Sequence, residues 1–247
     1  MDLSKTLTIY GRKPVLEALN DPTLSPQRLH LADSNRDGGI VSQIETAAKR
    51  CDIPISYQDR LALSRISKNG KQDQGVALDL FCPNYNTLDG FLSQKPQGRN
   101  SGFKGLLLDG ITNPQNVGMI IRSSYAAGID AIFYPKKSVA ALGPLVIKAS
   151  VGTAFRAPIV LCEDALSCVR ALKARGIQIA VMDSHAEKSL FDQADHSDTV
   201  FVLGGETDGA SDTIKNAANI SLRIPMKNGV ESLNVAVTAA LIGFLGP

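Results

Sequence analysis

A mostly parallel α/β fold is predicted by three features of the sequence. Short apolar runs alternate with segments of helical periodicity along the whole chain of 247 residues. The hydrophobic fraction of 44% and the charged fraction of 20% are ordinary for a globular protein. In the second half, glycine and polar residues follow directly after apolar runs, as they do where ligands meet the carboxyl ends of parallel strands.

The first 82 residues are predicted to form a small α/β domain, whose size of about 80 residues lies within the usual range. Three five-residue segments rich in apolar side chains indicate its strands, and the segments between them read as helices. The expected strands are Arg28–Ala32, Ile53–Tyr57 and Val76–Leu80. The expected helices are Pro14–Leu19, Ile40–Arg50 and Asp59–Ile66.

Residues 83–104 are predicted to be a linker between two domains. They are rich in Pro, Asn, Gly, Ser and Gln, which are typical of turns and loops. A short helix is expected within this segment, over Leu88–Ser93. The second domain is therefore expected to cover residues 105–247.

The second domain opens with Leu106–Asp109, an apolar run typical of a buried strand. Asn113 and Pro114 then mark a helix start, and the helix is expected over Gln115–Ala127. Further strands are expected at Ala131–Tyr134, Ile177–Met182, Thr199–Leu203 and Ile220–Ile224. Further helices are expected at Asp164–Ala174, Asp212–Ala217 and Ser232–Phe244.

Composition argues against several classes of protein. No apolar run approaches the roughly 20 residues that cross a membrane, and the N-terminus lacks the apolar region of a secretion signal. The four cysteines form no CxxC pair, so we expect no metal site and reduced thiols in the cytoplasm. The net charge is only +2, so composition alone does not indicate RNA.

The first segment with candidate chemistry is Asn113–Arg122, at the start of the predicted helix. Asn116 lies in its first turn, and Arg122 follows nearly two turns later, so the two can share a face. The alternative is that Asn116 merely caps the helix and that Arg122 is solvated. This segment alone favours that alternative.

The second segment is Leu203–Ser211, which follows a predicted strand and contains three glycines. Glycines there allow a ligand to approach the backbone closely, and Glu206 can accept hydrogen bonds from an amino or hydroxyl group. The alternative is a strand-to-helix turn with Ser211 as the helix cap. The GxGxxG spacing of dinucleotide-binding turns and the GK[ST] of phosphate loops are both missing.

The third segment is Ile224–Ala236, where a strand ends in proline and a polar loop leads into a helix. Free N–H groups at such a helix start can bind an anion or a carboxylate. The alternative is that Ser232 caps the helix. Asn234 still needs a reason, because asparagine is a poor helix former and its neighbours are apolar.

Taken together, the three segments resemble the three motifs of the SpoU/TrmH family in the SPOUT superfamily. The matching stretches are NPQNVGMIIRS from Asn113, FVLGGETDGAS from Phe201 and IPMKNGVESLNVAV from Ile224, with KASVGTA from Lys148 between them. The resemblance covers the second domain. The first domain is similar, more loosely, to the substrate-binding domain of RlmB-type rRNA guanosine-2′-O-methyltransferases, although Asp73 stands where relatives often have histidine.

The resemblance implies a fold that periodicity does not indicate, a parallel sheet closed by a deep trefoil knot. It also implies a homodimer and an activity, the transfer of a methyl group from S-adenosylmethionine to a ribose 2′-hydroxyl of structured RNA, with no role for DNA or a membrane. By the match, the residues expected to hold the cofactor are Leu203, Gly204, Gly205, Gly209, Ile224, Met226 and Leu233.

The family's catalytic positions correspond to five residues of this chain, Asn116, Arg122, Glu206, Ser232 and Asn234. Arginine is effectively always protonated, so a role for Arg122 as the base is doubtful on chemical grounds. We expect Arg122 to pair with an RNA phosphate and to stabilise the developing oxyanion, while Ser232 and Asn234 orient the reacting groups.

Cations of the first domain are candidates for phosphate contacts, although each is also consistent with a solvated surface charge. They are Arg12, Lys13, Arg65, Lys68 and Lys71, with Arg156 of the second domain as a further candidate. The preferred substrate is rRNA, because tRNA enzymes of the family often lack the first domain. The alternatives are a tRNA methyltransferase, a drug-resistance methyltransferase and a non-catalytic RNA-binding or ribosome-assembly factor.

Overall fold

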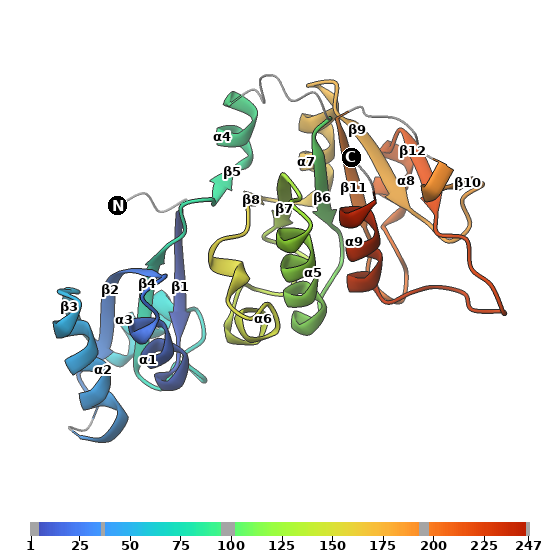
Figure 1. Ribbon diagram of the computed structural model, residues 1–247. Coiled ribbons are helices and arrows are strands. Elements are labelled where there is room, and N and C mark those ends of the chain that lie inside the picture. Colours follow the sequence, from blue (N-terminus) through green and yellow to red (C-terminus); the bar gives the residue numbers. More distant parts are fainter. Residues whose placement is uncertain (1–4, 36–37, 95–101, 193–197, 246–247) are drawn as a thin grey trace. The chain divides into compact units, whose positions relative to one another are not determined.

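The computed structural model describes residues 5–35, 38–94, 102–192 and 198–245, and the chain divides into two compact units (Figure 1). The smaller unit consists of Met1–Pro83 and Leu142–Pro144, and the larger one of Asn84–Ala141 and Leu145–Pro247. Residues 95–101 of the expected linker lie outside the described residues.

The smaller unit contains a four-stranded sheet in the order β1-β4-β2-β3. Only β2 and β3 run parallel, whereas β4 is antiparallel to both β1 and β2. This sheet is therefore mixed rather than mostly parallel. Its strands are β1 (Thr6–Tyr10), β2 (Ser25–Ala32), β3 (Ile55–Gln58) and β4 (Val76–Phe81), and its helices are α1 (Arg12–Asn20), α2 (Gly39–Arg50) and α3 (Arg60–Ser67).

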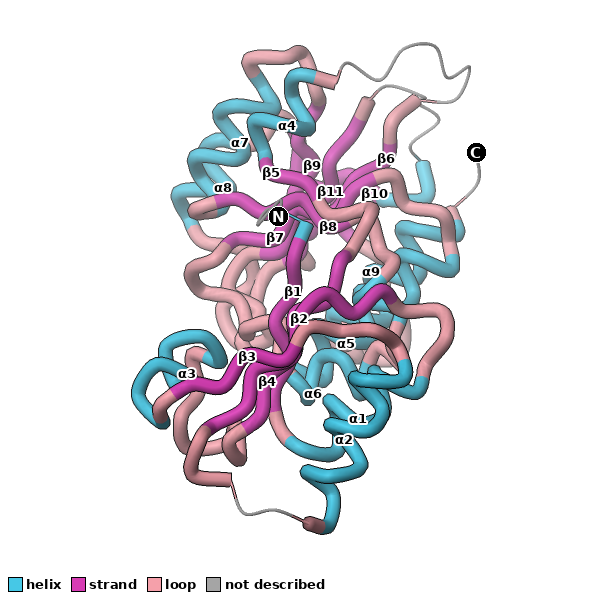
Figure 2. Tube along the Cα trace, turned by 90° about the vertical axis from the view of Figure 1, so that its left-hand side faces the viewer, coloured by secondary structure: helices cyan, strands magenta, loops and turns pink. Residues whose placement is uncertain are grey.

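Helices cover both faces of this small sheet, α1 and α2 on one side and α3 on the other (Figure 2). Beneath α3, Leu63 packs with Ala32 and Ala77 in a small apolar cluster. The sequence analysis did not predict β1. This edge strand buries only Leu7 and Ile9, so its apolar signal is short.

The larger unit contains an eight-stranded sheet in the order β10-β12-β9-β11-β6-β7-β8-β5, and every neighbouring pair is parallel. This confirms the predicted parallel α/β class. The strands are β5 (Asn86–Thr87), β6 (Lys104–Leu108), β7 (Ala131–Pro135), β8 (Ile159–Cys162), β9 (Gln178–Met182), β10 (Lys188–Ser189), β11 (Thr199–Leu203) and β12 (Ile220–Arg223). The helices are α4 (Leu88–Ser93), α5 (Pro114–Ala126), α6 (Pro144–Ala149), α7 (Ala165–Lys173), α8 (Asp212–Ala217) and α9 (Val235–Phe244), with single 3-10 turns at Thr153–Phe155 and Leu190–Asp192.

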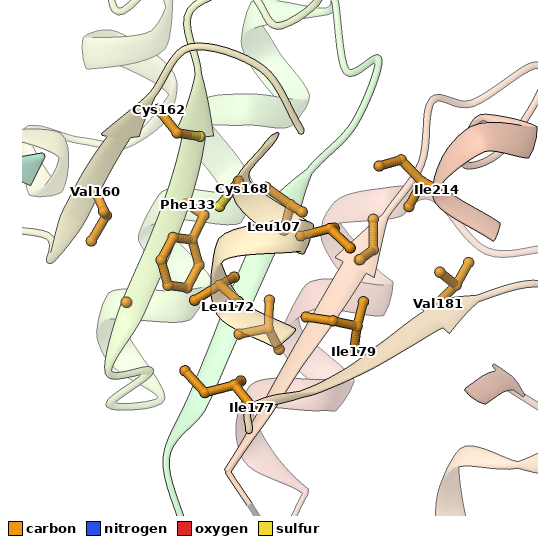
Figure 3. Packing of buried hydrophobic residues seen from close by; sticks show 14 of the residues in the cluster. Leu107, Phe133, Val160, Cys162, Cys168, Leu172, Ile177, Ile179, Val181 and Ile214 are labelled. Atoms are coloured by element: carbon orange, nitrogen blue, oxygen red, sulfur yellow. The ribbon is translucent and has the colours of Figure 1, made fainter. Parts of the chain in front are cut away.

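One face of the large sheet is covered by α4, α7 and α8 (Figure 2). The core below them includes Leu107, Phe133 and Leu172, all fully buried (Figure 3). Phe91 of α4 packs against Phe133 with ring centroids 5.1 Å apart. Although α4 falls within the segment expected to be linker, this contact makes it part of the larger unit.

The opposite face is covered by α5 and α9, which pack closely against each other (Figure 1). A β-carbon at Gly243 of α9 would lie 2.6 Å from that of Ala127, so only glycine fits at this approach. Lys104 of β6 donates a hydrogen bond of 2.6 Å from Nζ to the carbonyl of Leu245, next to the end of α9. These contacts fix α9 against the middle of the sheet.

Candidate active site

The three segments that the sequence analysis singled out meet at one edge of the large sheet. β6 and β11 are adjacent parallel strands, and Leu108 pairs with Leu203 at their carboxyl ends. The segments after β6, β11 and β12 therefore leave the sheet at the same edge. In open parallel sheets, ligands bind outside this edge, where successive connections diverge.

Asn116 lies in the first turn of α5 but does not cap the helix. The cap is Asn113, whose Oδ1 accepts a hydrogen bond of 2.9 Å from the N–H of Gln115. The side chain of Asn116 is instead directed into the protein, where the residue is only 3% exposed, and its Nδ2 donates to Oε1 of Glu206. The capping alternative for Asn116 is therefore wrong.

Asn234 is the N-cap of α9, which begins at Val235 rather than at Ser232 as predicted. Its Oδ1 accepts a hydrogen bond of 2.9 Å from the N–H of Ala236. This explains why a poor helix former precedes an apolar helix, and it means that Ser232 does not cap α9. The Nδ2 of Asn234 lies 3.2 Å from both Oδ1 of Asn116 and Oε1 of Glu206.

Glu206 is the centre of this network, because two amide groups donate to the same carboxylate oxygen. The side chain is exposed, and its Oε2 has no hydrogen-bond partner among the described residues. Hydrogen bonds to an ionised group are about twice as strong as neutral ones, so the carboxylate fixes both amides. The site thus offers one restrained carboxylate with a free acceptor oxygen.

The loop after β11 is a tight turn closed by glycine backbone. Gly205 and Gly209 exchange two N–H···O=C hydrogen bonds of 3.0 Å each. A β-carbon on Gly204 would lie 1.9 Å from the backbone nitrogen of Ala210, so no other residue fits there without moving the loop. Ser211 occupies the cap position of α8, but its hydroxyl donates to Asp109 at 2.9 Å instead of capping.

A pocket of about 580 Å³ lies between these loops, within the volume range of small-molecule sites. Each of the seven residues expected to hold the cofactor lines it, namely Leu203, Gly204, Gly205, Gly209, Ile224, Met226 and Leu233. Glu206, Ser232 and Asn234 line it as well. Asp183, His185 and Lys215, which the sequence analysis did not single out, contribute charged and polar groups to its wall.

Arg122 does not line the pocket, and neither does Asn116, whereas Glu206, Ser232 and Asn234 do. It lies on α5, six residues after Asn116, and its side chain is exposed. No hydrogen bond or ion pair of its guanidinium occurs within the described parts of the chain. Arg122 is therefore available to an external partner.

The candidate RNA cations of the smaller unit differ in their contacts. Arg12 is engaged, because its guanidinium donates to the carbonyl of Gln74 at 3.2 Å and to Oδ1 of Asn35 at 3.4 Å. The other four are exposed, namely Lys13, Arg65, Lys68 and Lys71.

Asp73 is fully buried. Its carboxylate accepts a hydrogen bond of 2.8 Å from the hydroxyl of Ser67 and pairs with Arg60 at 2.7 Å. It therefore fixes the loop that presents Lys68 and Lys71 to solvent.

Within the described ranges, the side chains include no group of three or more His, Cys, Asp or Glu that could hold a metal ion. Among the helices of the same ranges, none is long and apolar enough to cross a membrane.

Family models match both units of the chain. Residues 105–244 match the SpoU rRNA Methylase family, and residues 8–86 match the substrate-binding domain of RNA 2′-O ribose methyltransferases. The chain therefore belongs to the SpoU rRNA methylase family, which confirms the membership that the three motifs predict.

Curated relatives extend over nearly the whole chain. The 23S rRNA (guanosine-2′-O-)-methyltransferase RlmB of Xanthomonas campestris is 32% identical over 207 residues, which are 83% of this chain and 81% of the relative. The RlmB of Pseudomonas aeruginosa is 29% identical over 243 residues, which are 98% of this chain and 96% of the relative. Both units thus have counterparts in single proteins of similar length.

Solved structures share the fold. The SpoU methyltransferase AviRb of Streptomyces viridochromogenes, in complex with AdoMet, superposes with a TM-score of 0.64 at 21% identity, covering 98% of this chain and 89% of that one. An AdoMet-bound rRNA methyltransferase of Sinorhizobium meliloti gives a TM-score of 0.62 at 21% identity, covering 99% and 87%. These likenesses confirm the predicted α/β fold with a parallel sheet and a preceding smaller domain.

Proposed function

We propose that this protein transfers a methyl group from S-adenosylmethionine to the ribose 2′-hydroxyl of a guanosine in structured rRNA. The observation that carries the proposal is the hydrogen-bond network of Asn116, Glu206 and Asn234, of which Glu206 and Asn234 line the pocket. The names of the relatives support the reaction and the choice of rRNA, since RlmB proteins are 23S rRNA guanosine-2′-O-methyltransferases.

The pocket fits a nucleoside-type methyl donor. Its volume suits a ligand of that size, and a ligand can approach the backbone of Gly209 closely, because no atom lies within 4 Å of the position that a β-carbon would take there. Leu203, Ile224, Met226 and Leu233 supply apolar walls. When bound there, S-adenosylmethionine supplies an activated methyl group on its sulfonium.

The chain's own residues would then position the RNA. In-line transfer needs a fixed approach of the ribose oxygen, and orientation at the well-oriented limit contributes about 7–11 kcal/mol to such reactions. The free Oε2 of Glu206 and the hydroxyl of Ser232 are placed to hold the sugar at the pocket. Arg122, which stays protonated, would pair with a phosphate and stabilise the developing oxyanion.

In this proposal, residues 1–82 form the RNA-binding domain and residues 105–247 the catalytic domain. The exposed Lys13, Arg65, Lys68 and Lys71 would contact phosphates, as Lys and Arg commonly do. Arg12 would act indirectly by holding the loop at Gln74. A cytoplasmic location follows from the proposed substrate.

We further propose a homodimer that uses the outer surfaces of α5 and α9. These helices expose large apolar side chains, with Met119 39%, Tyr125 40%, Val237 47% and Phe244 67% exposed. Large apolar side chains exposed on two neighbouring helices favour a protein interface. Val237→Asp and Phe244→Asp should each yield monomers in sedimentation velocity, whereas Phe191→Asp, at an equally exposed site in a separate 3-10 turn, should remain dimeric. Dimers in all three variants would contradict the proposed interface.

A trefoil knot is proposed for the same region. After β12, near the far edge of the sheet, the chain returns through residues 224–234 and packs α9 against α5 and β11. A return of this kind to the middle of the sheet is what a threaded C-terminal helix requires.

The proposal is tested by offering labelled S-adenosylmethionine with separate rRNA and tRNA pools from a strain that lacks this protein. Label in rRNA that survives alkaline cleavage as a dinucleotide is the expected result. Label in tRNA alone would contradict the substrate choice and favour the tRNA alternative. If calorimetry detects no cofactor binding and neither pool is labelled, the proposed methyltransferase activity is contradicted. That result would favour a non-catalytic RNA-binding or ribosome-assembly factor.

A further inference from the structure

Asp183 adds an ordered carboxylate to the pocket wall, outside the three motifs. It follows β9 directly and lines the pocket, and its side chain is only 18% exposed. Its Oδ1 accepts a hydrogen bond of 3.0 Å from the N–H of His185, and its Oδ2 lies 3.4 Å from Nζ of Lys215. The backbone N–H of His185, followed by Lys215, lowers the pKa of this carboxyl, so it is ionised at neutral pH.

We propose that Asp183 binds the ribose hydroxyls of the methyl donor. This inference rests on the proposed placement of the donor in the pocket. An ionised carboxylate has about four lone-pair positions, so Asp183 can accept bonds from a ligand besides those from His185 and Lys215. Adjacent hydroxyls on a sugar present two donors side by side, which suits a carboxylate.

The strand order places Asp183 away from the transferred methyl group. In the sheet, β9 lies next to β11, and β11 lies next to β6. Asn116 is on α5, the helix that follows β6 in the chain. Two strand spacings amount to about 10 Å. The amide network marks the side where RNA reacts, so a group bound by Asp183 belongs to the non-reacting part of the donor.

Charge favours hydroxyls over the donor's α-ammonium group. Asp183 already pairs with Lys215, so the pair has no net charge and a second cation would be repelled by the lysine. Neutral hydroxyl donors meet no such repulsion. The pair therefore offers hydrogen-bond acceptors of fixed orientation and carries no net charge.

The test measures the affinity of the product S-adenosylhomocysteine and of its 2′,3′-dideoxy analogue by calorimetry. The wild type should bind the dideoxy analogue at least about tenfold more weakly, as expected for loss of bonds to a charged group. Asp183→Ala should weaken S-adenosylhomocysteine by a similar factor but leave the affinity for the dideoxy analogue nearly unchanged. Glu187→Ala, which removes an exposed acid outside the pocket lining on the same connection after β9, is the matched control and should bind both as the wild type does.

Equal losses for both ligands in Asp183→Ala would overturn the inference, because the carboxylate would then not contact the hydroxyls. The inference would also be overturned if Asp183→Ala weakened every ligand except a desamino analogue of S-adenosylhomocysteine. Asp183 would then bind the ammonium group. The comparison of ligands on the wild type keeps the test valid if Asp183→Ala does not fold. Failure of the wild type to bind S-adenosylhomocysteine at all would instead contradict the proposed function.

Discussion

At the scale of single residues, the site depends on amide groups whose hydrogen bonds leave no freedom of orientation. Asn116 can act as a donor to Glu206 only through Nδ2, while its Oδ1 accepts from Asn234. Asn234 uses its own Oδ1 to cap α9. Each side chain therefore needs both an acceptor and a donor at fixed places, which explains why asparagine suits both positions.

Asn116→Asp should disrupt this network. The change sets a second carboxylate against Glu206 in a site where Asn116 is 3% exposed, and like charges in such a place repel. We expect a loss of about 1–3 kcal/mol in the free energy of unfolding and at least about a 100-fold lower rate of methyl transfer. Urea denaturation and a labelled-methyl assay measure the two effects.

Gln115→Glu is the matched control for Asn116→Asp. It makes the same amide-to-acid change one residue earlier on an exposed side chain at a helix start, where acids are favourable. It should retain stability and activity. Equal effects of the two substitutions would show that the network at Asn116 is unimportant.

Arg122 should affect RNA without affecting the donor. Its side chain is exposed and does not line the pocket, so Arg122→Ala should lower kcat or raise the KM for RNA and leave the Kd for S-adenosylhomocysteine unchanged. Arg122→Lys keeps the charge and should retain measurable activity. Weaker donor binding in Arg122→Ala would contradict this division of roles.

At the scale of elements, the tight turn after β11 makes the pocket. Gly204→Ala would set a β-carbon against the backbone of Ala210 and force the turn away from β11. Donor binding should fall at least about tenfold, in line with the 1–3 kcal/mol of an overpacked site. Calorimetry with S-adenosylhomocysteine measures this change.

Gly128→Ala separates destabilisation from loss of the pocket. Gly128 has a φ of +73°, so alanine is strained there, but no atom lies within 4 Å of the added β-carbon. This position follows α5 and is remote in sequence from the turn. The variant should lose stability but bind the donor normally, and similar binding losses in both glycine variants would refute the specific role of Gly204.

The helix starts show where sequence reasoning succeeds and where it stops. The motifs identified Asn116, Glu206 and Asn234, and the structure brings them into hydrogen-bond contact. Which residue caps α9 was not predictable, because Ser232 and Asn234 are both suitable caps and only the fold decides between them. Asp183 carried no sequence signal, since its role comes from a strand that is distant in the chain.

At the scale of the whole molecule, the alternation of apolar runs was sufficient to predict a parallel sheet in the larger unit. It did not predict β5 or β10, because strands of two residues carry too few apolar positions to be recognised. It also missed β8, although its four residues are all apolar. It also did not predict the antiparallel pairs of the smaller sheet. Whether two neighbouring strands run parallel or antiparallel depends on the connections between them. The alternation of side chains within a strand is the same in both cases, so it cannot predict strand direction.

Acid should destabilise the smaller unit through Asp79. Burial raises the pKa of this carboxyl, but hydrogen bonds from His30 and Thr8 outweigh it and lower the pKa below its ordinary value of 3.8. The unfolded chain then binds the proton more readily, so the stabilisation is present above about pH 4 and is lost as the pH falls through the folded-state pKa. Urea denaturation from pH 7 to pH 3 should show this loss in the wild type.

Asp79→Asn should remove that part of the pH dependence, because the variant has no carboxyl to protonate. Glu17→Gln, an exposed acid on α1 of the same unit, should keep it. An unchanged pH profile in Asp79→Asn would show that other groups are responsible.

The central claim is that the pocket and its amide network direct methyl transfer to a ribose oxygen. Its most direct test is mass spectrometry of nucleosides from rRNA treated with the purified wild-type protein and S-adenosylmethionine, with Asn234→Asp treated in parallel. We predict 2′-O-methylguanosine with the wild type and at least about 100-fold less with the variant. Methylation on the base, or equal amounts of 2′-O-methylguanosine from both proteins, would contradict the claim.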